Sequence, residues 1–104
     1  MIRKAFKMKL KKGFKAEYQK RHSEIWPELL KLLKKSGISD YSIYLDEETL
    51  TLFVFMKLTD NNTSDVLPEK PLMRKWWDFM SDIMEVNTDN SPVSIGLEEV
   101  FYMD

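Results

Sequence analysis

Hydrophobic and polar residues alternate in the first part of the chain, residues 2–10. The hydrophobic positions of this stretch are Ile2, Phe6, Met8 and Leu10. A period of two predicts a β-strand with one buried face. Residues 38–46 alternate in the same way and predict a second strand, with Tyr41, Ile43 and Leu45 on one face.

Residues 49–58 predict a third strand, joined to the second by a short polar hairpin turn. This strand is hydrophobic on both faces. One face would carry Leu50, Leu52, Val54, Met56 and Leu58, and the other Phe53 and Phe55. Such a strand is covered on both sides. In a chain this small, one layer of helices covers one face only, and a second copy of the same sheet is the simplest cover for the other.

Residues 14–36 predict a helical segment that is broken near Pro27, because proline lacks the amide hydrogen and its ring clashes with the preceding turn. Ser23 is the expected N-cap of the restarted helix, and Gly37 is a natural stop. Hydrophobic residues recur every three to four positions over residues 72–84 and predict a second main helix.

The remaining segments complete the order of elements. Residues 59–71 are polar, hold two prolines and predict a loop with at most one short helical turn. Residues 85–92 predict a turn-rich loop, and residues 93–103 a last strand with a bulge at Gly96.

This order predicts a single domain over residues 1–104 with the ferredoxin-like βαββαβ fold, in which helices cover one face of an antiparallel sheet. The third strand, hydrophobic on both faces, predicts that two such sheets pack face to face as a dimeric α+β barrel. Many unrelated functions occur on this architecture, so the fold alone names none of them.

Composition excludes several classes of function. Charged residues make up 32% of the chain and the net charge is −1, so no basic excess favours nucleic acid. No hydrophobic run approaches the roughly 20 residues of a membrane helix, and the N-terminus does not resemble a signal peptide. The chain has no cysteine, which excludes disulfides and thiolate chemistry and points to the cytoplasm.

The candidate chemistry centres on His22, the only histidine. Tyr18 precedes it by four residues and Trp26 follows it by four, so the three rings would share one face of a helix. Imidazole can give and take protons near neutral pH, although a lone histidine on a helix is commonly structural. Whether Trp26 lines a pocket or the core stays open, because Pro27 follows it directly.

Trp76 and Trp77 form the second candidate feature. Neighbouring helical residues point about 100° apart, so both indoles cannot face the same core. A half-exposed indole beside a buried one suits stacking against the apolar face of a sugar ring. The carboxylates form no recognisable catalytic pair, and the chain has no glycine-rich phosphate loop.

The chain resembles the L-rhamnose mutarotase family. The resemblance rests on MIRKAFKM, EYQKRHSEIWPEL, YSIYLD, RKWWDFMSDIM and NTDNSPVSIGLEEVFYM, which follow the family's order and spacing. It covers almost the whole chain and becomes weak over residues 47–71. The resemblance implies homodimers of ferredoxin-like protomers that interconvert the α and β anomers of L-rhamnose without a metal or cofactor.

The resemblance also assigns roles to five residues. His22 would be the proton donor, Tyr18 and Tyr41 would contact the sugar, and Trp76 and Trp77 would hold the pyranose ring. The residue chemistry agrees, because mutarotation moves one proton to the ring oxygen and another from the anomeric hydroxyl.

Two other functions stay open at this point. One is haem-binding or small-ring monooxygenase chemistry on the same dimeric scaffold, with His22 as an axial ligand. The other is a non-catalytic sugar-binding module that uses the same aromatic residues.

Overall fold

The computed structural model describes residues 1–104. Helices and strands follow one another as the hydrophobic pattern predicts, with two helices in place of one broken helix after the first strand. The elements are β1 (Ile2–Lys9), α1 (Lys15–Ser23), α2 (Pro27–Lys35), β2 (Ile38–Asp46), β3 (Thr51–Leu58), the 3-10 helix η1 (Ser64–Glu69), α3 (Pro71–Met80) and β4 (Ile95–Leu97).

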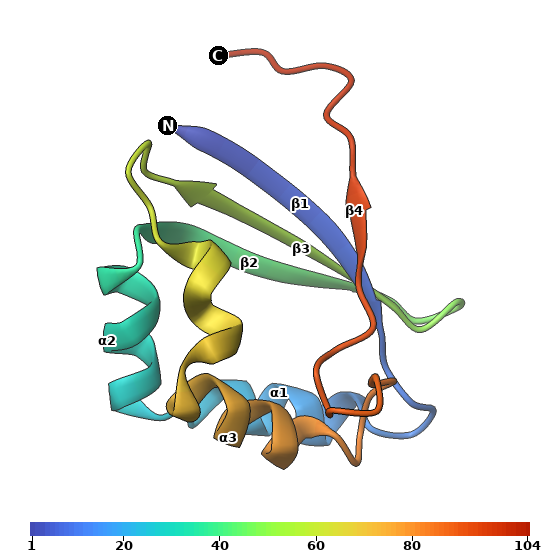
Figure 1. Ribbon diagram of the computed structural model, residues 1–104. Coiled ribbons are helices and arrows are strands. Elements are labelled where there is room, and N and C mark those ends of the chain that lie inside the picture. The colour runs from blue at the N-terminus through green and yellow to red at the C-terminus, as the bar shows by residue number, and fades with distance from the viewer.

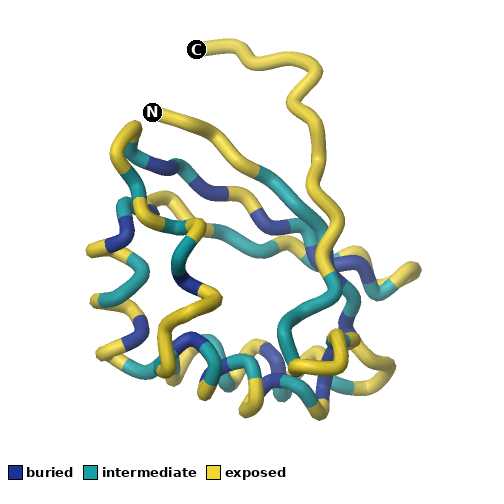
Figure 2. Tube along the Cα trace, viewed as in Figure 1, coloured by how far each residue is buried: buried dark blue, intermediate teal, exposed yellow.

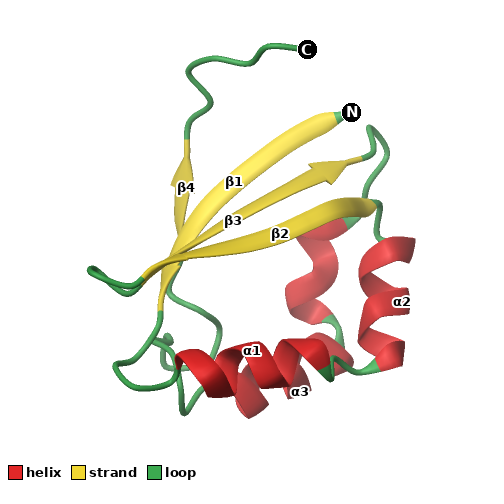
Figure 3. Cartoon of the chain, turned by 180° about the vertical axis from the view of Figure 1, so that it is seen from behind, coloured by secondary structure: helices red, strands yellow, loops and turns green.

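The four strands form one antiparallel sheet in the order β2-β3-β1-β4. β1 and β3 pair along their full length, from Ile2 opposite Leu58 to Lys9 opposite Thr51. All helices lie on one side of this sheet (Figures 1 and 3). The opposite face of the sheet carries no helix, so a single chain leaves it uncovered.

The hydrophobic core lies between the sheet and the helices, where the buried segments of Figure 2 gather. Its most deeply buried side chains are Leu29 of α2, Leu52 and Val54 of β3, and Ile83, each at most 1% exposed. Burying one such side chain contributes roughly 1.5–3 kcal/mol to stability. The hydrophobic side chains that alternate along β3 therefore hold the helices against the sheet.

Pro27 divides the first helical segment in two, as predicted. Trp26 caps α2 in an extended conformation, and Pro27 takes the first helical position, where a missing amide hydrogen leaves no bond unmade. The expectation that Ser23 caps the second helix is wrong. Ser23 is the last residue of α1, and its hydroxyl donates to the carbonyl of Lys20 at 2.8 Å. The break lets α2 turn away from α1 and lead the chain back to β2 (Figure 1).

A bulge in β2 brings Tyr41 to the helical side of the sheet. The register with β3 shifts between Ser39 and Ser42, so that two residues of β2 oppose one residue of β3. The bulged pair is Asp40, with φ +48°, and Tyr41. An additional residue moves every later side chain of the strand to the other face. Ile38 and Tyr41 therefore both face the helices, although residues three apart on a regular strand would face opposite sides.

Two elements end differently from the prediction. α3 ends at Met80, four residues early, and Met84 instead forms an isolated antiparallel bridge with Leu10. β3 begins two residues late, because Leu50 has φ +61° and belongs to the hairpin turn. In both places the backbone groups find hydrogen-bond partners in a neighbouring segment, so the helix or strand does not have to continue.

The last strand is much shorter than the predicted residues 93–103, since β4 covers only Ile95–Leu97. The expected bulge at Gly96 is also wrong, because Gly96 pairs in regular register with Phe6. β4 is an edge strand, and beyond Leu97 no further pairs with β1 form.

Residues 98–104 run past the sheet as an exposed tail (Figures 1 and 2). Arg3 holds its beginning through a salt bridge of 2.7 Å to Glu99 and lies 3.4 Å from the ring centre of Tyr102. The hydrophobic side chains of this tail are among the most exposed in the molecule. A tail of this composition has no core to enter within its own chain.

Gly37 tests how tightly α2 is joined to β2. It has φ +95°, and a Cβ atom there would collide with the side chain of Thr59 and lie 2.8 Å from Cβ of Asn62. We expect Gly37→Ala to lower the free energy of unfolding by roughly 1–3 kcal/mol, from backbone strain and this collision. Urea denaturation measures the loss.

Gly13→Ala is the matched control. Gly13 has φ +89°, but a Cβ atom added there would have nothing within 4 Å. This variant should lose about 1 kcal/mol, from the backbone conformation alone. Equal losses at the two sites would show that the contacts of Gly37 contribute nothing.

Candidate active site

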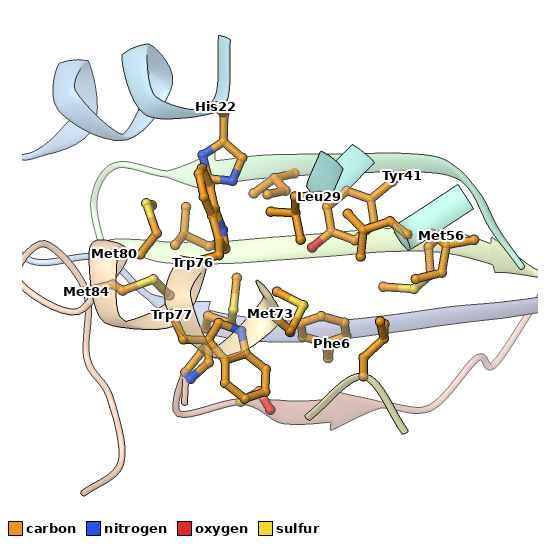
Figure 4. A pocket seen from close by; sticks show the side chains of 18 of the residues that line it. Phe6, His22, Leu29, Tyr41, Met56, Met73, Trp76, Trp77, Met80 and Met84 are labelled. Carbon is orange, nitrogen blue, oxygen red and sulfur yellow. The ribbon is translucent and has the colours of Figure 1, made fainter. Parts of the chain in front are cut away.

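A cavity of about 1170 Å³ lies between the helices and the sheet. Pockets for small ligands are typically about 300–1,000 Å³, so this one has room for a small molecule and some water. Of its 36 lining residues, 20 are hydrophobic. All five residues predicted for the site line the cavity; they are Tyr18, His22, Tyr41, Trp76 and Trp77. Figure 4 labels the last four of them.

Two helices hold His22 between aromatic rings. Tyr18 lies one turn earlier on α1, and its ring stacks on the imidazole with a centroid distance of 4.4 Å. Trp76 of α3 meets the imidazole edge-on at 5.5 Å, and Figure 4 shows His22 projecting from α1 above it. The four-residue spacing on α1 thus produces the shared face that the sequence predicted.

The hydrogen bond of His22 determines its tautomer. Its Nδ1 lies 3.1 Å from the backbone carbonyl oxygen of Tyr18. A carbonyl oxygen only accepts, so Nδ1 carries the proton and Nε2 keeps its lone pair. Burial lowers the pKa of His22, and the bond to Tyr18 only partly offsets this. At neutral pH the side chain is therefore uncharged, with a free lone pair on Nε2.

Two phenol groups face the same cavity. Burial raises the pKa of Tyr41 to about 12, and burial followed by the nearby Tyr41 raises the pKa of Tyr18 above its ordinary value. Tyr41 as a whole residue is 43% exposed, but its hydroxyl reaches into the pocket (Figure 4). Both groups stay protonated at neutral pH and can donate hydrogen bonds to a ligand.

Two of the three tryptophans line the cavity, and the third packs behind them. Trp76 is buried and Trp77 is half-buried, which agrees with their expected difference, and both line the cavity. Trp26 does not line it. Trp26 packs edge-on against Trp76 at 5.1 Å and beside Phe79 at 5.7 Å, so it supports the pocket from behind.

Arg21 connects α1 to the end of α3. Its guanidinium donates to Glu17 at 2.7 Å, to Asp82 at 2.8 Å and to the carbonyl of Phe79 at 2.6 Å. The Arg21 side chain is 12% exposed. The hydrogen bond to Asp82, and then that to Glu17, hold the pKa of Arg21 above its usual value despite burial. This permanent charge ties the helix of His22 to the helix of Trp76.

A polar wall of the cavity was missed by sequence reasoning. Asn87, Asp89 and Ser91, which the sequence suggested only as turn residues, line the pocket together with Arg74 of α3. Arg74 donates to Asp89 at 3.0 Å. Turn chemistry uses the same residue types as ligand binding, and no spacing in the sequence relates Arg74 to a loop 15 residues later.

The cavity brings one imidazole, two phenols and two indoles together with this polar wall. No group of three or more His, Asp or Glu side chains is placed to hold a metal ion. None of the helices is long and apolar enough to cross a bilayer. Fold and cavity together define a small α+β protein with an imidazole and two phenols at a cavity large enough for a small molecule.

Comparisons with known proteins identify the family. The family model for L-rhamnose mutarotase matches residues 3–103, and the chain belongs to this family. L-rhamnose mutarotases from Formosa agariphila and Bacteroides thetaiotaomicron are 60% and 61% identical to it, each over 104 residues and the full length of both proteins. A crystal structure of the L-rhamnose mutarotase from Formosa agariphila superimposes with a TM-score of 0.93, at 58% identity and full coverage of both chains.

The state of His22 can be measured directly, because the chain has one histidine. In a ¹⁵N-edited NMR titration we expect a pKa below the ordinary 6.5 and the Nδ1–H tautomer of the neutral ring. Since the folded pKa is the lower one, this histidine contributes stability above pH 6.5 that is lost as the pH falls through the folded pKa. A pKa above 6.5, or the Nε2–H tautomer, would contradict this assignment.

Proposed function

We propose that the protein catalyses the interconversion of the α and β anomers of L-rhamnose, as an isomerase acting on an aldose. Membership of the L-rhamnose mutarotase family supports this proposal over haem chemistry or simple sugar binding. The observation that carries the proposal is His22, a half-buried neutral imidazole whose Nδ1 is bonded to the backbone and whose Nε2 is left for a ligand.

In the proposed reaction Nε2 of His22 acts first as a base. It removes the proton of the anomeric hydroxyl, and the imidazolium then protonates the ring oxygen as the bond between that oxygen and the anomeric carbon breaks. The open aldehyde rotates, and closure from its other face reverses these transfers. One proton moves between two oxygens on the same carbon, so the reaction needs no cofactor. General acid–base catalysis of this kind contributes about 10²–10⁴-fold.

The tyrosines are proposed to hold the sugar oxygens. Their hydroxyls stay protonated because burial raises the pKa of Tyr18 above its ordinary value and raises the pKa of Tyr41 to about 12. Each can donate a hydrogen bond to an oxygen on which negative charge develops as the ring opens, which is the stage at which donation is most favourable. Tyr18 also stacks on His22 and supplies the carbonyl that orients it.

The indoles are proposed to hold the carbon skeleton. The C–H bonds of a pyranose face and the C6 methyl group are apolar, and flat aromatic rings bury them well. Trp76 is close to His22 and Trp77 lies further along the cavity (Figure 4). A sugar held against both rings would present its anomeric centre to the imidazole.

We also propose that the fold is ferredoxin-like and that the active protein is a homodimer. The strand order β2-β3-β1-β4 with helices on one face supports the former. The uncovered face supports the latter, since it carries Tyr44, Phe55 and Ile95 with exposures of 65%, 43% and 58%. A second sheet packed on this face would bury them in a dimeric α+β barrel. The lack of cysteine is in keeping with a cytoplasmic location.

The catalytic proposal is tested by saturation-transfer NMR on L-rhamnose at anomeric equilibrium. We expect the protein to accelerate exchange between the anomers and His22→Ala to return it towards the uncatalysed rate, a loss of at least about 10²-fold. Lys20→Ala, on the exposed face of the same helix, should keep the wild-type rate. L-fucose, L-mannose and D-glucose measured in parallel define the sugar preference.

A folded His22→Ala variant with the wild-type rate would remove His22 from the mechanism. L-rhamnose binding without faster exchange in the wild-type protein would instead support a sugar-binding module.

The dimer is tested by sedimentation velocity. We expect the protein to sediment at twice the 12.4 kDa mass of the chain, and Phe55→Lys to shift it to the monomer, because a charge would then have to be buried between the sheets. Lys31→Glu is the control and should stay dimeric, because Lys31 is exposed on α2 and α2 lies on the helical side of the sheet. A wild-type protein that sediments as a monomer at micromolar concentration would contradict the proposal.

A further inference from the structure

Trp77 is held differently from Trp76. Trp76 is buried among Trp26, Phe79 and His22, whose rings fix it on three sides. No aromatic ring packs on Trp77. The guanidinium of Arg74, one turn earlier on α3, instead lies 5.3 Å from the centre of its indole. A cation at this distance from an indole face is attracted to it.

Arg74 is also bonded on both sides of α3. Its Nε donates to the carbonyl of Pro68 at 2.6 Å, which connects it to η1. Its Nη1 donates to Asp89 at 3.0 Å, which connects it to the loop formed by residues 87–92, the 87–92 loop. One planar side chain therefore orients an indole, a 3-10 helix and a loop together, which a flexible ammonium group could not do.

A second bond joins the 87–92 loop to the same face of α3. Asn90, with φ +68°, donates its side-chain amide to Asp78 at 3.1 Å. Trp77 and Asp78 follow Arg74 by three and four residues, so both are its neighbours on the helix surface. The loop is thus fastened to α3 at two points, one before and one after Trp77 along the helix.

Bonds within the 87–92 loop make it rigid. Asp89 accepts from the backbone N–H and the hydroxyl of Ser91, at 3.0 and 2.5 Å. Asn87 donates to the Ser91 hydroxyl at 3.0 Å, and the backbone N–H of Asn87 donates to the carbonyl of Ser91 at 2.8 Å. These bonds to Ser91, and then the guanidinium of Arg74, hold the pKa of Asp89 well below its usual range.

We propose that Arg74 is a positioning residue for the sugar: it holds Trp77 and the 87–92 loop as one rigid wall of the cavity, against which the pyranose ring is seated. The observation behind this is that Arg74, Trp77, Asp89 and Ser91 all line the cavity that holds His22. The proposal rests on the proposed function. Arg74 acts through its neighbours, so it determines how well the sugar is bound and leaves the proton transfers at His22 unchanged.

The exposure of Arg74 and Asp89 distinguishes a role in positioning the sugar from a role in stability. The side chains of Arg74 and Asp89 are 43% and 53% exposed, and exposed ion pairs contribute little to stability. Removing Arg74 should therefore leave the melting temperature nearly unchanged. An effect on sugar binding in such a variant then comes from the geometry of the wall.

The test compares Arg74→Met with Lys75→Met by saturation-transfer NMR over a range of L-rhamnose concentrations. Lys75 is exposed on the same helix, so its variant loses the same charge without touching the wall. For Arg74→Met we expect KM to rise roughly 3- to 10-fold, the range of one weakened aromatic contact. We expect kcat to stay within about twofold, while Lys75→Met retains both wild-type constants.

Two further measurements sharpen the comparison. Asp89→Asn should raise KM in the same direction, and the double variant should be little worse than Arg74→Met, because both changes break one connection. The three tryptophans give three indole N–H signals in a ¹H–¹⁵N spectrum. Arg74→Met should shift the Trp77 signal and weaken its response to added L-rhamnose, with the Trp26 signal unchanged.

Equal KM values for the wild-type, Arg74→Met and Lys75→Met proteins would overturn the proposal. A fall in kcat at constant KM would also overturn it, because Arg74 would then act on the reacting atoms. A wild-type protein that binds L-rhamnose without faster exchange would refute the proposed function alone, and the dissociation constants from the indole shifts would still decide the role of Arg74.

Discussion

The contacts of Arg21 between α1 and α3 are the constraint on which the cavity depends. A guanidinium that is 12% exposed needs partners for its donors, and it finds them in Glu17, Asp82 and the carbonyl of Phe79. The acidic partners Glu17 and Asp82 are 42% and 65% exposed, and ion pairs with exposed partners contribute little to stability, so these contacts act mainly on geometry. The distance between the two helices is therefore set by hydrogen bonds of defined length. His22 follows Arg21 directly on α1, so its distance from Trp76 is set by the same contacts.

The two faces of the sheet have different surroundings. The inner face and the helices enclose a cavity in which loss of water lowers the pKa of His22 and raises the pKa of Tyr41 to about 12. An imidazole ready to accept a proton thus shares the cavity with a phenol ready to donate a hydrogen bond. The outer face keeps exposed aromatic residues such as Tyr44 and Phe55, which pack on each other at 5.9 Å.

Elements that bury their own residues could be predicted from the sequence. The alternation of β1 to β3 and the helical period of α3 follow from which side chains leave water, and Pro27 marks the break between α1 and α2 by local sterics. The ends could not be predicted in the same way. α3 stops at Met80 because Met84 pairs with Leu10, and β4 stops at Leu97 because no more of β1 pairs with it. These limits depend on partners that are distant in sequence.

The candidate site shows the same division. One histidine, a tyrosine one helical turn before it and a pair of tryptophans can be recognised from residue type and spacing, since spacing on one helix determines which side chains share a face. The family resemblance extended this set to Tyr41. Only the tertiary structure decided that α1 and α3 bring His22 against Trp76, that a bulge in β2 brings Tyr41 to the helical side, and that Nδ1 of His22 is bonded so that Nε2 is the basic atom. It also decided that Arg74 meets Asp89 beside Trp77. The sequence determines which side chains share a face of a helix or strand and where a helix breaks, because both depend on neighbouring residues. Contacts between elements, and the pKa values that result from them, exist only once the chain has folded around the cavity.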